Sequence, residues 1–209
     1  MKMQKKKVLY IKTPKTASTF IAEWLRKNGN VNVFTEPLMG GMLARQPSDR
    51  ERRWEVIKNT NYDMKLVSVR NPFTRTVSAY RWLLQNSARP SRGLPWIKNR
   101  KDSILGFKSF LKKPLPELYK ENYYTWQICL PVYDYARCDS FSYDYIIRLE
   151  SLMKNLNEVA PAHQTKKLPK MESSGEYNFK DYYDEENKDL VIKKYNKDFE
   201  YFSYKKNLL

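Results

Sequence analysis

Apolar and polar positions follow one another along this chain in an order that predicts strands separated by helices. Residues 8–11 form a short apolar run typical of a buried strand. After the polar stretch at 13–18, apolar side chains recur at the spacing of one helix face, at Phe20, Ile21, Trp24 and Leu25. The first segment is therefore predicted to be a strand, a loop and a helix, half of a β-α-β unit.

The same alternation continues through the rest of the chain. A capping box at 48–51 predicts a second helix, which leads into an apolar strand at 64–69. Asn71-Pro72 precedes a helix at 73–85. Further helices are predicted near 103–111, at 117–130 before Pro131, from Glu150 and from the acidic residues 184–186, with a strand near 143–149. Residues 86–102 and 161–177 are predicted loops. The alternation predicts an α/β fold with a mainly parallel central sheet flanked by helices.

Composition narrows the class of protein. A chain of 209 residues suits one domain, and 41% apolar with 14% aromatic residues is enough for a globular core, so 1–209 is expected to be a single domain. Thirty-nine Lys and Arg against 23 Asp and Glu give a net charge of +16, which predicts an anionic partner. Nucleic acid, acidic polysaccharide and a phosphorylated nucleotide all fit that charge.

Cysteines and apolar runs exclude several other classes. Cys129 and Cys138 match neither a disulfide framework nor a paired metal-binding motif, so no structural disulfide and no metal are expected. No apolar run is long enough for a membrane anchor or a secretory segment. The sequence predicts a soluble, cytoplasmic chain.

The loop Thr13-Pro14-Lys15-Thr16-Ala17-Ser18-Thr19 is the first candidate for chemistry. It lies between a predicted strand and a predicted helix, where backbone N–H groups and the helix dipole favour an anion. Lys15 adds a positive charge, and Thr16, Ser18 and Thr19 add hydroxyl groups. The loop lacks the GxxxxGK[ST] pattern, which argues against an ATPase or kinase. An ordinary strand-to-helix connection with a capping Thr or Ser is the alternative.

A second candidate follows the strand at 64–69. Arg70 comes directly after that strand, and Ser78 lies in the helix behind Asn71-Pro72. The carboxyl ends of parallel strands meet at one edge of a sheet, so both loops are expected to open on the same edge. Arg70 and Ser78 are then predicted to share a second phosphate. The alternative is a surface arginine near a helix start.

Together the two motifs resemble those of the sulfotransferases that use 3′-phosphoadenosine 5′-phosphosulfate (PAPS). TPKTASTF resembles their 5′-phosphosulfate loop, and VRNPFTRTVSAY resembles their 3′-phosphate strand and helix. The resemblance implies a P-loop-NTPase-like three-layer fold, PAPS as donor, PAP as product and no metal. It implies that Pro14 to Thr19, with Lys15 on the bridging oxygen, hold the 5′-phosphosulfate, that Arg70 and Ser78 hold the 3′-phosphate, and that Phe20 lies against the adenine.

A weaker similarity extends to the carbohydrate-modifying branch. It rests on Asn122 to Gln127, on the segment from Tyr143 to Leu152, and on the aromatic tail at 182–204, whose rings are also typical of a packed core. The histidine common near 41–42 in that branch is absent here, as are its His and Asn before Ser173. The resemblance implies a saccharide acceptor, with small molecules and proteins as the alternatives.

The proton acceptor is the least determined group. Glu36 lies 21 residues after Lys15, a spacing similar to that of the catalytic glutamate in some sulfotransferase branches, although a solvated loop glutamate fits as well. His163 lies among lysines in a predicted loop, and Asp63 and Glu55 are outside candidates. Lys15 and Ser18 are expected to stabilise the departing phosphate. The rival functions are a PAP- or PAPS-binding homologue without activity and a basic nucleic-acid-binding protein, which no RRM, KH, helix-turn-helix or zinc signature supports.

Overall fold

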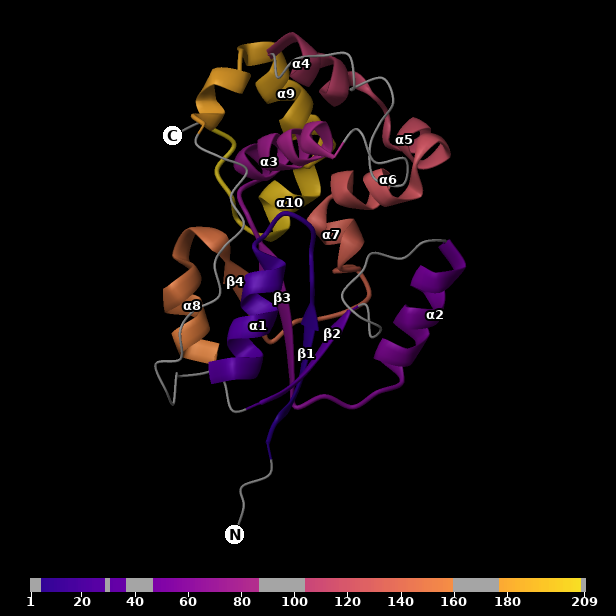
Figure 1. The fold of residues 1–209 in the computed structure, drawn as a ribbon, viewed down its shortest axis with the longest axis vertical. Coiled ribbons are helices and arrows are strands. Elements are labelled where there is room, and N and C mark those ends of the chain that lie inside the picture. Colours follow the sequence, from indigo (N-terminus) through magenta and orange to yellow (C-terminus); the bar gives the residue numbers. More distant parts are fainter. Residues whose placement is uncertain (1–4, 29–30, 37–46, 87–103, 160–176, 208–209) are drawn as a thin grey trace. The chain divides into compact units, whose positions relative to one another are not determined.

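The computed structural model of the chain describes residues 5–28, 31–36, 47–86, 104–159 and 177–207. These residues group into two units (Figure 1). The first comprises the described parts of Met1–Arg70 and Ala136–Glu172, and the second those of Asn71–Tyr135 and Ser173–Leu209. The first unit contains the sheet, and the second is helical.

The sheet of the first unit has four parallel strands, in the order β2-β1-β3-β4. They are β1 (Lys7–Ile11), β2 (Asn32–Glu36), β3 (Met64–Val69) and β4 (Tyr145–Arg148). The predicted strands at 8–11, 64–69 and 143–149 correspond to β1, β3 and β4. The predicted α/β fold with a parallel central sheet flanked by helices is confirmed.

Both faces of this sheet are buried, which explains why the central strands are continuous apolar runs. On one face Val8 and Tyr10 pack with residues of α1 (Ser18–Asn28) and α8 (Leu152–Val159). On the other face Leu9, Ile11, Val67 and Val69 are fully buried. The unit also contains α2 (Pro47–Lys58) and a 3₁₀ turn, η2 (Leu149–Ser151). The helix predicted from Glu150 begins with that turn, and α2 begins at Pro47, one residue before the predicted capping box.

Strand β2 was not predicted, and the alternative given for Glu36 was a solvated loop residue. The structure corrects this, because Glu36 is the last residue of β2 and pairs in register with Ile11 of β1. The strand lies at the edge of the sheet, where Phe34 is exposed and Thr35 is buried. A five-residue strand with a half-covered edge lacks the apolar run that identified β1 and β3.

Two aspartates form hydrogen bonds to neighbouring strands at the amino-terminal edge of the sheet. Asp63 precedes β3, and its carboxylate accepts a hydrogen bond from the Lys7 backbone N–H at 2.7 Å. Asp144 precedes β4 and accepts from the Lys65 N–H in the same way, also at 2.7 Å. The backbone N–H of each aspartate donates in return to the carbonyl of the same lysine, at 2.9 Å in both cases. These contacts fix the register at the edge opposite the loops that follow the strands.

The second unit consists of helices. They are α3 (Pro72–Gln85), α4 (Ile104–Lys112), α5 (Leu115–Glu121), α6 (Tyr123–Cys129), α7 (Val132–Tyr135), the 3₁₀ turn η3 (Phe179–Tyr182), α9 (Glu185–Lys194) and α10 (Asn196–Tyr201). The predicted helices at 73–85, 103–111 and from the acidic residues 184–186 correspond to α3, α4 and α9. Asn71 caps α3, and Asp184 caps α9 by accepting from the Asn187 N–H at 2.7 Å.

The prediction of a single helix at 117–130 was wrong, because the helix is interrupted at Asn122. That residue is extended, with φ −159° and ψ 107°, and its side chain accepts from the Thr125 N–H at 2.9 Å. A side chain that caps a new helix competes with continuation of the previous one. The segment from Asn122 to Thr125 is therefore a helix start.

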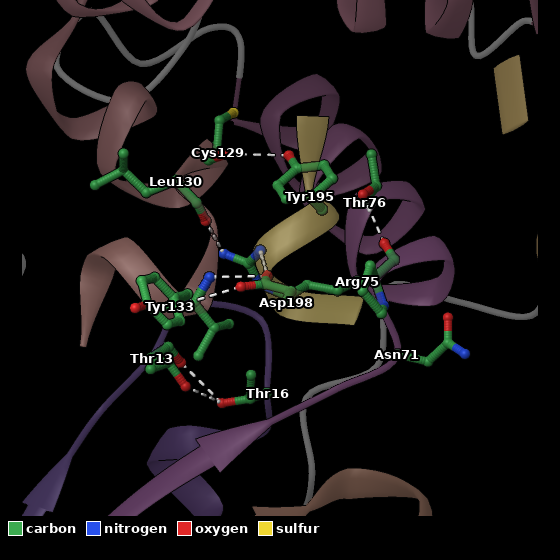
Figure 2. Close-up of polar contacts among 12 residues, drawn as sticks. Thr13, Thr16, Asn71, Arg75, Thr76, Cys129, Leu130, Tyr133, Tyr195 and Asp198 are labelled. Carbon is green, nitrogen blue, oxygen red and sulfur yellow. Dashed lines mark hydrogen bonds and ion pairs between the residues drawn. The ribbon is translucent and has the colours of Figure 1, made fainter. Parts of the chain in front are cut away.

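A buried charge pair joins four helices of the second unit, α3, α6, α7 and α10 (Figure 2). The Arg75 guanidinium donates to the carbonyls of Ile128 and Leu130, and it lies 3.8 Å from the Asp198 carboxylate. The same carboxylate accepts from the backbone N–H groups of Val132 and Tyr133, both at 2.8 Å. Arg75 and Asp198 are 1% and 2% exposed, so each charge depends on these partners.

The predicted loops at 86–102 and 161–177 lie almost entirely outside the described residues. Within the described part of the chain, no helix is both long and apolar enough to cross a membrane.

Candidate anion-binding site

The strand order of the first unit creates a place where a ligand can bind. From β1 the chain proceeds to β2 on one side, and from β3 it proceeds to β4 on the other side. In open α/β sheets, ligands bind outside the carboxyl ends of two adjacent strands whose connections diverge in this way. The loop with Lys15 follows β1, and Arg70 follows β3. Both sequence motifs therefore begin at this position.

The loop after β1 has an unusual backbone. Lys15 and Ala17 have left-handed φ angles of 65° and 57°, with Thr16 between them. This conformation costs a non-glycine residue roughly 1–2 kcal/mol, so it persists only where the surroundings fix it. The Ala17 carbonyl accepts from the Ile21 N–H at 3.1 Å and so starts α1. Successive N–H groups in such a turn, followed by a helix start, form an anion-binding concavity.

Four buried hydroxyl groups hold the loop against β3. The Ser68 hydroxyl oxygen lies 2.6 Å from that of Thr16, 3.0 Å from that of Thr13 and 2.7 Å from the Tyr10 hydroxyl. The Thr13 hydroxyl donates to the Ser68 carbonyl, and the Thr16 hydroxyl donates to the Thr13 carbonyl at 2.9 Å. Figure 2 shows the paired Thr13 and Thr16 side chains. All four residues are fully buried.

Positive charge gathers at this edge of the sheet. A terminal nitrogen of Arg70 lies 3.5 Å from the Lys15 carbonyl, so the two predicted cationic residues are neighbours. Lys12, between β1 and the loop, is half-buried, and its pKa is lowered mainly by burial and further by Arg26. Arg26 in turn donates to the Thr35 hydroxyl at 3.1 Å. The cations favour an anion at this edge over any neutral ligand.

The loop residues differ in what they offer a ligand. Lys15, Ala17 and Ser18 are half-buried and Thr19 is exposed, whereas Pro14 and Thr16 are buried. The Thr16 hydroxyl is engaged within the protein, with the Thr13 carbonyl and the Ser68 hydroxyl. Phe20 is 9% exposed and packs in the core formed by β1, α1 and α8.

The predicted partner of Arg70 lies in the other unit. Ser78 is on α3 of the second unit, where it is 5% exposed. Its predicted role in sharing a phosphate with Arg70 stays a prediction.

The candidates for the proton acceptor are placed differently. The backbone of Glu36 lies at the carboxyl end of β2, beside the end of β1 that leads to Lys15. Asp63 lies at the opposite edge of the sheet, where its carboxylate accepts a hydrogen bond from the Lys7 backbone N–H. This position removes Asp63 as a candidate. Glu55 is exposed on α2. His163 lies outside the described residues.

Sequence reasoning missed Ser68, which supports the site, and the buried Arg75–Asp198 pair of the second unit. Ser68 is a polar residue inside an apolar strand, and a serine at such a position is a sign of a buried hydrogen bond. Arg75 and Asp198 carried no comparable signal, since they are 123 positions apart. Among the described residues, no group of three or more His, Cys, Asp or Glu is arranged to hold a metal ion.

Comparison with known proteins gives one match. A family model described as "Sulfotransferase family" matches residues 2–205, nearly the whole chain. No curated protein and no solved structure matches the chain.

Proposed function

The chain belongs to the sulfotransferase family, and on that basis we propose that it transfers a sulfuryl group from PAPS to a hydroxyl or amine of an acceptor. The family as a whole uses PAPS as its donor. The observation that supports the proposal is the left-handed loop around Lys15, next to Arg70 at the diverging ends of β1 and β3. In this proposal residues 1–209 work as one sulfotransferase domain.

The residues present fit the donor's charges. The N–H groups of Lys15 to Ser18 and the Lys15 ammonium suit the 5′-phosphosulfate, because the loop combines a positive charge with donors in a concave turn. Arg70 suits the 3′-phosphate, with Ser78 as its proposed second donor and Phe20 as the proposed neighbour of the adenine. Recognition of both anionic ends would set PAPS apart from nucleotides with a single anionic end.

The proposed reaction is an in-line displacement at sulfur. The acceptor oxygen or nitrogen forms the new bond to sulfur while the bond from sulfur to the 5′-phosphate oxygen breaks, and PAP leaves with that electron pair. Lys15 and Ser18 stabilise the charge that develops on the departing oxygen; one such preorganised donor contributes on the order of 3 kcal/mol. Glu36 takes the acceptor's proton, since its backbone lies at the same sheet edge.

The proposed acceptor is a saccharide, with small molecules and proteins as the alternatives. The net charge of +16 exceeds what a single nucleotide requires, so an acidic polysaccharide fits better than a neutral one.

A labelled-donor assay tests the function. The chain is incubated with isotope-labelled PAPS and a panel of saccharides, phenols and peptides, and the products are read by mass spectrometry. Transfer by the wild type that falls at least about a hundredfold in Lys15→Ala supports the proposal. Lys154→Ala, an exposed lysine on α8, is the matched control and should retain full activity. PAP binding with no transfer to any acceptor would favour the inactive homologue.

A further inference from the structure

The hydroxyl cluster of Tyr10, Thr13, Thr16 and Ser68 has no direct part in the proposed chemistry, because all four side chains are fully buried. The cluster spans the two segments that form the donor site. Thr13 and Thr16 belong to the loop after β1, whereas Ser68 belongs to β3 and lies two residues before Arg70. The cluster therefore joins the loop to the strand that ends at Arg70.

One arrangement of hydrogens satisfies all four hydroxyls. Tyr10 donates to Ser68, Ser68 to Thr16, Thr16 to the Thr13 carbonyl, and Thr13 to the Ser68 carbonyl. In this arrangement the Ser68 hydroxyl accepts from Tyr10 and donates to Thr16, and its oxygen also lies 3.0 Å from that of Thr13. We call this chain of hydrogen bonds, from Tyr10 through Ser68 and Thr16 to Thr13, the hydroxyl relay. In it Tyr10 contacts the loop through Ser68, so Ser68 is its central member.

The hydroxyl relay contacts the loop at Thr16, between its two left-handed residues. Thr16 stands between Lys15 and Ala17, the two left-handed residues, and its hydroxyl is fixed from both sides by Thr13 and Ser68. A strained backbone persists where its surroundings over-determine it. Without the Ser68 hydroxyl, Thr16 loses its hydrogen bond to β3 while the Thr13 bond to the residue-68 carbonyl remains, so the loop is held less tightly and the left-handed turns relax toward lower-energy conformations.

We propose that Ser68 is a positioning residue for the Thr13–Ser18 loop and that Tyr10 positions Ser68 in turn. Neither residue touches the ligand. Both act by holding the loop amides and Lys15 in the geometry that binds the donor, so the identity of that donor rests on the proposed function. The described hydrogen bonds assign the order of action, from Tyr10 through Ser68 to Thr16.

The test compares Tyr10→Phe, Ser68→Ala and the double variant with the wild type. Tyr195→Phe is the matched control, because Tyr195 is a fully buried phenol that donates one hydrogen bond, to the Cys129 carbonyl, in the second unit. Tyr10→Phe keeps the ring and its packing, so it remains informative if Ser68→Ala folds poorly. The measurements are the affinity for PAP by calorimetry, donor and acceptor KM, and amide hydrogen exchange of residues 13–18 in the free protein.

Ser68→Ala is expected to weaken PAP binding and raise donor KM about tenfold, with acceptor KM unchanged, and Tyr10→Phe to do so about threefold. Exchange of the loop amides rises in both. The double variant should match Ser68→Ala alone, because Tyr10 acts through Ser68. Tyr195→Phe should leave PAP affinity and loop exchange as in the wild type.

If the wild type binds PAP, two results would overturn the proposal. Wild-type PAP affinity in both single variants removes the positioning role, while the proposed function stands. Additive losses in the double variant remove the order from Tyr10 to Ser68. A wild type that does not bind PAP refutes the proposed function instead, and loop exchange then decides the inference by itself: unchanged exchange in Ser68→Ala refutes it, and faster exchange supports it.

Discussion

Replacing Ala17 by glycine tests the left-handed loop independently of any ligand. At a φ of 57° the alanine side chain crowds its own backbone, at a cost of roughly 1–2 kcal/mol that glycine avoids. Glycine also gives the unfolded chain more freedom, which costs about 0.4–1 kcal/mol. The difference predicts that Ala17→Gly raises the free energy of unfolding by about 0.5–1 kcal/mol.

Ala22→Gly is the matched control for this prediction. Ala22 lies inside α1 and is 1% exposed, so glycine there loses helix propensity and one buried methyl group. Those losses predict a destabilisation of about 2 kcal/mol. The two substitutions thus make the same chemical change with opposite expected signs.

Urea and thermal unfolding measure both variants. For a chain of this length, 1 kcal/mol shifts Tm by about 2–4 °C, so Ala17→Gly is expected to melt slightly above the wild type and Ala22→Gly clearly below it. A destabilisation of Ala17→Gly equal to that of Ala22→Gly would refute the left-handed conformation at position 17, and with it the shape of the anion-binding turn.

Three further predictions concern the buried charge pair, a buried thiol and the proposed base. Arg75→Met leaves the buried Asp198 carboxylate uncompensated and should destabilise the protein by about 3–5 kcal/mol in urea unfolding; the Arg75→Met/Asp198→Asn double variant should recover part of this loss, and an equal or larger loss would contradict the pairing. Burial raises the pKa of Cys129 from 9.0 to about 11. Because the thiol of the unfolded chain ionises at lower pH than the buried thiol, the free energy of unfolding falls as pH rises from about 9 to about 11, by about 3 kcal/mol in total. Cys129→Ala should therefore show a flatter pH dependence of the free energy of unfolding. Glu36→Gln should keep PAP affinity and lose roughly 10²–10⁴ in kcat, whereas a wild-type kcat would assign the proton to another group.

The sequence predicted the elements that carry strong local signals. The apolar runs of β1 and β3 and the Asn71-Pro72 start of α3 are all encoded within a few residues, and the loop between β1 and α1 follows from them. The parallel pairing of strands then brings Lys15 and Arg70 to one edge, as predicted from the parallel orientation of the strands.

Features that depend on distant residues could not be predicted. Tyr10 and Ser68 are 58 positions apart, and nothing local reveals that their hydroxyls meet beneath the loop. Strand β2 is defined by its pairing with β1, because its local propensity is weak and tertiary contacts decide. The break at Asn122 is local instead: the Asn122 side chain caps α6 through the Thr125 N–H, and the apolar pattern of 117–130 does not reveal that choice.

The most direct test of the donor site is a comparison of PAP with adenosine 5′-phosphate by isothermal titration calorimetry. The two nucleotides differ only in the 3′-phosphate, for which Arg70 is the proposed partner. A charge-assisted contact of this kind predicts that PAP binds about ten- to a hundredfold more tightly, and that Arg70→Ala removes the difference. Equal affinities of the wild type for the two nucleotides would contradict the proposed site.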